Sequence, residues 1–434
     1  MSNRAFSGEI PGVLVFMASA YVISAVAVSQ MPGWNVAVRV IAAVYAIIHL
    51  LCFLARRIRM VKPNAVHVLI IIWSVVGVIG GYETLNLSSL FARLWTMVQL
   101  IGVSYLLYSL AVEMKSLKWL EWSFLLGVFV SLLWLIVTTG GHLGSERISG
   151  TEGNPNVLAF ILLLNCVISL DLLWQYRNMI LKGIFLANIA FSYPFLLATG
   201  SRKGILGFFL IVGISWMLTG TIRNRGKRLL SMMCAGLAVI LALGLFISRL
   251  EESPYFGRIQ NIERFVKGER LVKQERSLPG RAEMIKRGTE LALKNPFFGV
   301  GLDQFRYYNN SLSLTSIDQS YSHSNVIEVL ADTGFIGFAI YYSAYVIILL
   351  KLLYLRKKCP FGPARRYLHL SFLIGIIVVI YDLFSVTYYT KGYWFALTLI
   401  LCAIVLARGQ IEHRRVNNAV GSFKRFPVSQ TDVK

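Results

Sequence analysis

Residues 320–350 read SYSHSNVIEVLADTGFIGFAIYYSAYVIILL. The second half of this stretch, residues 335–350, carries no charged side chain, and together with its flanks it can cross a hydrocarbon core of about 30 Å as a helix. The first half is polar, because His323 lies among serines and an asparagine, and Glu328 and Asp332 follow one helical turn apart. The stretch therefore predicts a membrane helix that begins at a polar threshold.

Similar apolar runs recur along the whole chain. The 434 residues are 56% hydrophobic, and the mean hydropathy is +0.63. We predict an all-α integral membrane protein with about 12 transmembrane helices and no removable signal peptide. The predicted spans are 13–29, 34–55, 65–81, 92–112, 119–139, 155–175, 180–199, 203–221, 228–248, 330–353, 366–388 and 391–407.

The basic residues predict the orientation. Loops on one side, with the two terminal segments, hold 25 Lys and Arg residues, whereas the short loops and helix ends on the other side hold six. Because basic residues are enriched in short cytoplasmic loops, we predict that the N- and C-termini are cytoplasmic. The net charge of +22 is then mostly membrane anchoring, and no nucleic acid partner is expected.

The remaining 12 basic residues lie in one long loop between spans 9 and 10. We predict that it is periplasmic and carries interfacial helices. The expected organisation is one integrated membrane domain with four parts: a nine-span region (1–248), the long loop (249–329), a three-span region (330–407) and a basic cytoplasmic tail (408–434). None of the five cysteines falls in an outer loop, so no disulfide or metal framework is expected.

Polar side chains suited to chemistry gather on the predicted outer side. Arg147 and Asn154 belong to a turn-rich loop, which is equally well a simple solvated connection. Arg202 and Lys203 lie at the start of a helix, where free backbone amides add positive potential, and this combination suits a phosphate or pyrophosphate. Arg281 opens an expected interfacial helix, and a surface salt bridge is at least as good an interpretation of its charge.

The polar threshold has both structural and functional interpretations. Asn325 can cap the helix with Glu328 as in a capping box, and Asp332 would keep the first turns at the wet rim. His323 precedes the cap on a loop, and an imidazole on a water-accessible rim can act as a general base. Asp382 lies within a span, where it is either functional or paired with an arginine at a helix end.

Several of these stretches resemble one family. GRAEMIKRGTELALKNPFFGVGLDQF followed by HSNVIEVLADTGFIGFAIYY resembles the hallmark region of the bacterial O-antigen ligase and O-antigen polymerase superfamily. RISGTEGNPNVLA and TGSRKG resemble its upstream elements, so the likeness covers residues 147–345. Many relatives have Asn directly after the motif histidine, whereas this chain has Ser324 between His323 and Asn325.

The resemblance implies a membrane-embedded glycosyltransferase of the bacterial inner membrane, with its active site facing the periplasm. Such enzymes move a glycan from undecaprenyl diphosphate to a sugar hydroxyl, in polymerisation or in ligation to lipid A-core. They use no nucleotide sugar, and no metal or other cofactor is implied. By motif, Arg202 and Arg281 match the two functional arginines and His323 the functional histidine. Arg147, Lys203, Asn154 and Asp382 are further candidates for binding the diphosphate or the glycan.

Polymerase and ligase remain open alternatives, with a slight preference for polymer assembly because no acceptor-specific feature is visible. A lipid-linked glycan flippase or another 12-span secondary transporter is the alternative from a different class. Transporters commonly have two related halves and charged residues deep in their spans. Here the middles of the spans are nearly free of charge, and no half-to-half repeat is found.

Overall fold

The computed structural model describes residues 10–28, 31, 33–58, 60–110, 114–140, 147–218, 277–311, 321–360 and 362–423. Within these ranges the chain is helical and has no strand, which confirms the all-α class. Nine helices there are long and apolar enough to cross a membrane. They are α2 (Trp34–Leu54), α3 (Ala65–Ile79, extended by η1, Gly80–Glu83), α4 (Leu87–Leu110), α5 (Met114–Thr139), α6 (Pro155–Gln175), α7 (Met179–Ala198), α13 (Asn325–Lys358), α14 (Pro363–Phe384) and α15 (Lys391–Phe423).

Two further predicted spans coincide with shorter helices. These are α1 (Gly12–Ala27) and α8 (Arg202–Leu218), with 16 and 17 residues. The predicted span 228–248 lies outside the described residues, so a count of 12 stays a prediction. The expected interfacial helices of the long loop correspond to α11 (Ser277–Lys294) and α12 (Phe305–Ser311).

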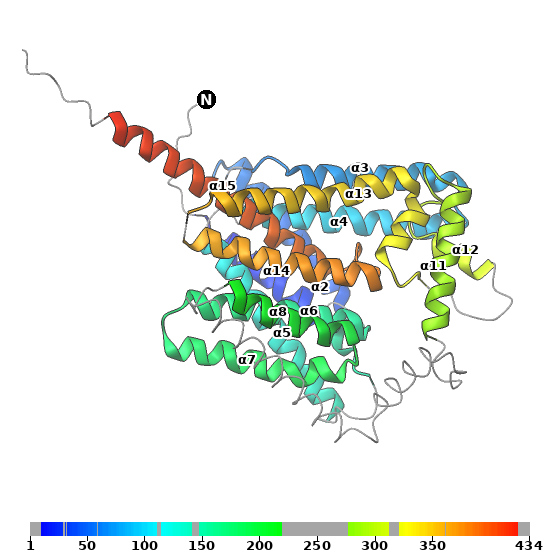
Figure 1. Ribbon diagram of the computed structural model, residues 1–434, viewed down its shortest axis with the longest axis horizontal. Coiled ribbons are helices and arrows are strands. Elements are labelled where there is room, and N and C mark those ends of the chain that lie inside the picture. Colours follow the sequence, from blue (N-terminus) through cyan, green and yellow to red (C-terminus); the bar gives the residue numbers. More distant parts are fainter. Residues whose placement is uncertain are drawn as a thin grey trace, which may run out of the picture.

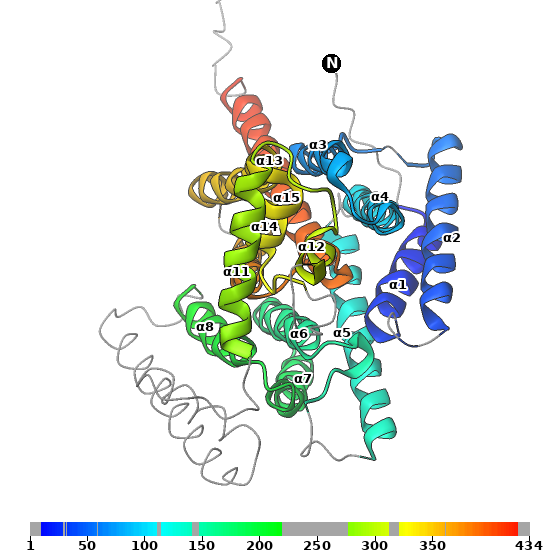
Figure 2. The same ribbon diagram turned by 90° about the vertical axis from the view of Figure 1, so that its right-hand side faces the viewer.

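The long helices form one bundle around α6. Figure 1 shows most of them running side by side, and Figure 2 shows α6 between α5, α7, α8 and α14 when the bundle is seen end on. Asn165 and Ser169 of α6 bond α7, with Asn165 Nδ2 donating to Ser192 Oγ at 2.9 Å and Asn188 Nδ2 to Ser169 Oγ at 2.8 Å. Interhelical hydrogen bonds of this kind hold helices together where water is absent.

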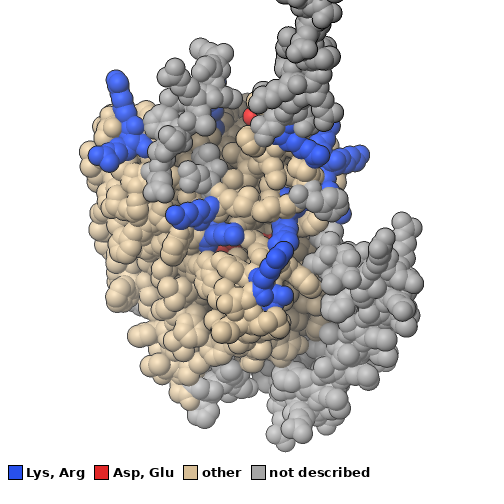
Figure 3. Space-filling model, turned by 90° about the vertical axis from the view of Figure 1, so that its left-hand side faces the viewer, with Lys and Arg blue, Asp and Glu red and all other residues tan. Residues whose placement is uncertain are grey.

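The two ends of the bundle differ in character. α11 and α12 lie across one end, which we name the α11 end (Figure 1). Lys and Arg side chains gather on the face at the opposite end, where few acidic side chains are visible (Figure 3). Two contacts there join basic residues to other helices, since Lys351 donates to Asn64 at 3.2 Å and Arg366 to the carbonyl of Trp174 at 3.1 Å. The basic residues of the sequence predict this concentration of Lys and Arg at one end of the bundle.

The helix α13 is broken near its start. Gly334 has φ 63° and ψ −171°, a conformation that interrupts the helical hydrogen bonds. The turn at residues 296–301 fills the gap: Gly301 N donates to Asp332 O at 2.8 Å, and Phe335 N donates to Pro296 O at 2.7 Å. Residues 296–301, PFFGVG, are therefore a backbone clamp on α13, and we call them the 296–301 clamp.

Glycines are required on both sides of this contact. A Cβ on Gly334 would lie 2.6 Å from the carbonyl carbon and oxygen of Phe297, and one on Gly299 would lie 2.5 Å from Ala331 O. Neither backbone group can rotate away as a flexible side chain could. Gly334 and Gly337 both permit close packing, and at Gly334 the contact is backbone against backbone.

Asp332 has a different place from the one its sequence position suggests. It is fully buried, and its two carboxylate oxygens accept the backbone amides of residues 303, 304 and 305 at 2.8, 3.2 and 2.9 Å. The prediction that it keeps the first turns wet is therefore wrong. Three amides at the start of α12 satisfy this carboxylate, and it fixes that short helix against α13.

Candidate functional site

Three segments meet at the α11 end of the bundle. They are the start of α8, the loop at residues 321–324 that leads into α13, and residues 385–390 between α14 and α15. Ser385 joins all three: Lys203 Nζ donates to Ser385 Oγ and, at 3.0 Å, to Phe384 O, while Asn325 N donates to Ser385 O at 3.0 Å. The structure thus brings Lys203 near the loop that carries His323.

His323 lies on a loop that internal hydrogen bonds anchor. It is exposed and has φ 57°, whereas its neighbours Ser322 and Ser324 are buried. Ser322 Oγ donates to Ser324 O at 2.7 Å, and Ser322 N donates to Glu328 Oε2 at 2.9 Å. Glu328 therefore holds the loop from within the protein. A left-handed residue between two anchored serines turns the imidazole outward.

Asn325 does not cap α13, so the predicted capping box is wrong. The helix begins after Ser324, and the Asn325 carbonyl oxygen Oδ1 accepts the amides of Thr387 and Tyr388 at 3.0 and 3.2 Å. Its amide Nδ2 donates to Asp382 Oδ2 at 3.4 Å. Asn325 is completely buried, so its side chain serves tertiary contacts and not the helix end.

Asp382 is buried in a network of hydroxyl groups. Tyr345 Oη donates to Asp382 Oδ2 at 2.5 Å, and Thr387 Oγ1 donates to its other oxygen. No ion pair to Asp382 is found in the part of the chain that the structure describes, so the alternative of a pairing with an arginine at a helix end is not seen there. The carboxylate joins α13, α14 and residues 385–390, which positions the loop that contacts Lys203.

The remaining residues of the upstream motifs border the start of α8. Arg202 is the first residue of α8 and is exposed. Arg147 is also exposed, and its Nε donates to Thr199 O at 2.9 Å. Asn154 caps α6 by accepting Asn156 N at 2.9 Å, and the Asn156 side chain accepts Ser201 Oγ at 3.1 Å. Arg147 therefore lies beside the α8 start, while Asn154 has a capping role.

Arg281 lies in α11, but its side chain is outside the described residues. α11 crosses the α11 end of the bundle, and its first turns, which contain Arg281, are on the side of α8 in Figure 2. The C-terminal part of α11 is fixed on α13, since a Cβ on Gly288 would collide with the side chain of Ile327. The backbone thus carries Arg281 to the same end of the bundle as Arg202 and His323.

Glu152 adds a pH-sensitive group to this end. It ends η2 (Gly150–Glu152), is half-buried, and one of its carboxylate oxygens has no partner among the described residues. Burial raises the pKa of its carboxyl group from 4.5 to about 8, although the charge of Lys391 opposes the rise.

We therefore expect stability to fall as the pH rises toward 8. Because the folded-state pKa of Glu152 is raised, its contribution is complete below the unfolded pKa and is lost as the pH rises through about 8. The melting temperature of the purified protein between pH 6 and pH 9.5 measures this effect. Glu152→Gln should flatten the decline between pH 6 and pH 8, and an unchanged decline would contradict the assignment.

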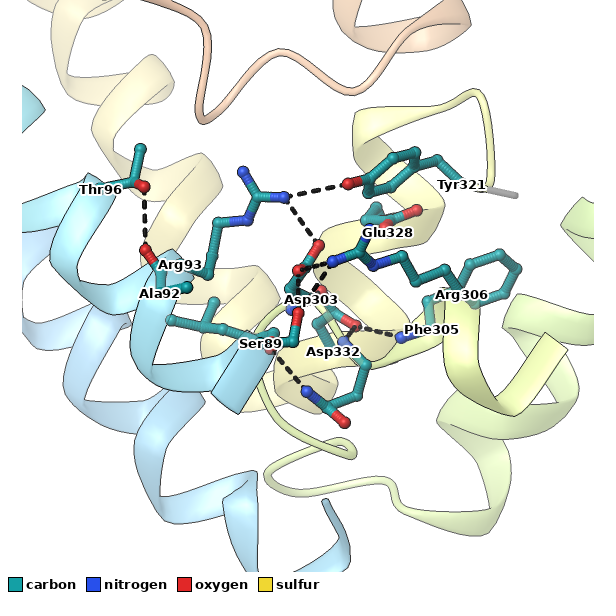
Figure 4. A network of polar contacts seen from close by, with 12 residues as sticks. Ser89, Ala92, Arg93, Thr96, Asp303, Phe305, Arg306, Tyr321, Glu328 and Asp332 are labelled. Atoms are coloured by element: carbon teal, nitrogen blue, oxygen red, sulfur yellow. Dashed lines mark hydrogen bonds and ion pairs between the residues drawn. The ribbon is translucent and has the colours of Figure 1, made fainter. Parts of the chain in front are cut away.

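The sequence interpretation missed a buried ionic cluster beside this site. Figure 4 shows Asp303 between Arg93 of α4 and Arg306 of α12, with Nη2–Oδ distances of 2.8 and 2.6 Å. Arg93 Nη2 also donates to Tyr321 Oη at 3.1 Å, and Arg306 Nη2 donates to Ser89 Oγ at 2.9 Å. An arginine at the end of a membrane span was the available signal, because such a charge is expected to have a partner.

Two comparisons bear on the whole arrangement. Residues 186–342 match the family model described as O-antigen ligase. The matched region contains α8, α11, α12, the 296–301 clamp, His323 and the first half of α13. No curated protein matches the chain.

Proposed function

We propose that the chain, whose residues 186–342 match the O-antigen ligase family model, transfers a glycan from undecaprenyl diphosphate to a sugar hydroxyl group. A glycosyltransferase of the ligase or polymerase type is what the family match supports in general. The donor, the acceptor and the side of the membrane are the parts that we add.

One observation carries the proposal. Lys203, at the start of α8, and Asn325, which follows the His323 loop, both bond to Ser385. A cation at a helix start suits a phosphate group, and an exposed imidazole suits a hydroxyl group that must lose its proton. These are the two requirements of glycan transfer from a diphosphate carrier.

The chemistry assigns a role to each group. Arg202, Lys203 and Arg281 bind the diphosphate oxygens, where negative charge develops as the bond from the anomeric carbon to the phosphate oxygen breaks. The acceptor oxygen forms the new bond to that carbon, and His323 takes its proton. The electron pair of the broken bond leaves with undecaprenyl diphosphate. Attack opposite the leaving group inverts the anomeric centre, and these residues need no metal ion for the step.

The proposed orientation places the α11 end in the periplasm of a bacterial inner membrane. The basic residues at the opposite end support this, since cytoplasmic loops are enriched in Lys and Arg (Figure 3). Lipid-linked glycans that have been assembled and flipped would then reach the His323 loop directly.

Reconstitution in liposomes tests the function. A defined undecaprenyl diphosphate glycan is offered with either a second copy of itself or lipid A-core. A ladder of longer lipid-linked chains identifies a polymerase, and a single transfer to lipid A-core identifies a ligase. Movement of the lipid across the bilayer without any transfer would contradict the proposal and favour a flippase.

We expect the two motif arginines to be needed for transfer. Arg202→Ala and Arg281→Ala should each lower kcat/KM about 10²- to 10³-fold, because each removes a cation from the developing charge of the leaving group. Lysine at either position should restore part of the rate, since it keeps the charge without the bidentate fork. Initial rates in liposomes measure the effect.

A matched control for the arginines is available on α11. The side chain of Lys286 is 69% exposed and lies 4.0 Å from Glu290, so Lys286→Ala should transfer glycan at the native rate. Native activity in either arginine variant would refute its assignment to the diphosphate.

A further inference from the structure

An open pocket of about 330 Å³ lies at the α11 end and has no role in the chemistry above. Its lining includes Ser88, Ser89 and Arg93 from α4, Asp303 from the turn after the 296–301 clamp, and Arg306 and Tyr307 from α12. α4 and α12 are far apart in the sequence, and the ion pairs of Asp303 hold them together. The pocket therefore lies between two helices that these ion pairs hold in place.

The lining offers both donors and an acceptor. Within the described part of the chain, the hydrogen bonds of Arg93 and Arg306 engage only Nη2 of each guanidinium, and a guanidinium has five N–H groups. Asp303 contributes carboxylate oxygens between them, and Ser88 and Thr96 contribute hydroxyl groups. Donors and acceptors side by side match sugar hydroxyls, which both donate and accept, whereas a diphosphate only accepts and would face the charge of Asp303.

Aromatic rings fix the two guanidinium groups. Arg93 lies over the ring of Tyr389 at 3.8 Å, and Arg306 lies 4.9 Å from the ring of Tyr307 and 5.2 Å from that of Tyr321. Cation–π contacts hold the planar forks in a set orientation. A pocket with oriented forks can recognise the arrangement of hydroxyl groups on a sugar ring.

The pocket adjoins the proposed catalytic residues. Tyr321, which bonds Arg93, is two residues before His323. Tyr389 belongs to the same short segment as Ser385, which contacts Lys203. Tyr321, the first residue of the loop at 321–324, therefore contacts a residue of the pocket. Asn325 follows that loop and bonds to Ser385, which also contacts Lys203.

We propose that this pocket binds a sugar unit of the acceptor glycan and presents the neighbouring hydroxyl group to His323. The inference rests on the proposed function, in which the diphosphate of the donor lies at Arg202 and Lys203. The ligand is a hydroxyl-rich saccharide, and its source is either a second lipid-linked glycan or lipid A-core.

Calorimetry on the purified full-length protein tests binding without any requirement for transfer. The probes are the oligosaccharide released by mild acid from the lipid-linked glycans of the source cells, and the core oligosaccharide of their lipopolysaccharide. Binding of the first identifies a lipid-linked acceptor, and binding of the second identifies a core acceptor. If neither binds the native protein, the proposal is wrong.

Two variants locate the saccharide. Arg306→Gln leaves the ion pair of Arg93 and Asp303 in place, and Ser88→Trp fills the rim without touching any ion pair, because Ser88 is exposed. Each should weaken saccharide binding about 10- to 100-fold. In transfer assays each should raise the KM for the acceptor and leave the KM for the donor unchanged.

Two comparisons separate this inference from the proposed function. His323→Ala and Lys286→Gln should bind the saccharide as the native protein does, even where transfer is lost. Binding without transfer by the native protein would refute the proposed reaction, but it would still support the pocket as a saccharide-binding site. Native affinity in both pocket variants, or displacement of the saccharide by inorganic pyrophosphate, would overturn the pocket.

Discussion

Replacement of His323 by Ala is expected to lower kcat for glycan transfer about 10²- to 10⁴-fold, the range that a lost general base typically costs. The side chain is exposed, so its removal leaves no cavity. The loop keeps its shape through the bond from Ser322 N to Glu328 Oε2 and the bond from Ser322 Oγ to Ser324 O, which His323→Ala leaves in place. Single-turnover transfer in liposomes measures the chemical step apart from product release.

The expected loss has a matched control at the other end of the bundle. His413 of α15 is exposed, and His413→Ala should transfer glycan at the native rate. His323→Gln, which can still accept a hydrogen bond but is a poor base, should remain as slow as His323→Ala. If glutamine restored the rate, His323 would be an orienting group and not a base.

Replacement of Gly334 by Ala is expected to destabilise the fold by about 3 kcal/mol or more. A residue with a Cβ is strained at this φ and ψ, and it would lie 2.6 Å from the Phe297 backbone. Alanine favours a straight helix, which would withdraw Phe335 N and Ile336 N from their acceptors in the 296–301 clamp. Thermal denaturation followed by size-exclusion chromatography measures the loss.

The clamp also links Gly334 to transfer. A straight α13 would move Asp332, which holds the amides at the start of α12, and with it Asp303. We therefore expect Gly334→Ala to lose transfer even where the protein still folds. Gly102→Ala in α4 is the control, since a Cβ there meets nothing within 4 Å. Native stability and activity in the Gly334 variant would contradict the clamp.

Much of the candidate site followed from local sequence. Arg202, Lys203 and His323 lie on ordered motifs, and the structure brings Lys203 and the His323 loop together through Ser385. The ionic cluster did not follow, because Arg93 and Asp303 are separated by 210 residues and neither shows a pattern that names its partner. The predicted helix cap at Asn325 was wrong for the same reason. Its side chain accepts the backbone amides of Thr387 and Tyr388, which are 62 and 63 residues away.

The sequence by itself determined the all-helical class, the position of most of the long apolar helices and the basic end of the bundle. These depend on the length of apolar runs and on charge in short loops, which are local properties of the chain. Only the tertiary structure decided what the buried carboxylates do. Asp332 binds an amide at the start of α12 and Asp382 binds Tyr345 of α13, because a buried charge must find its partners wherever folding brings them.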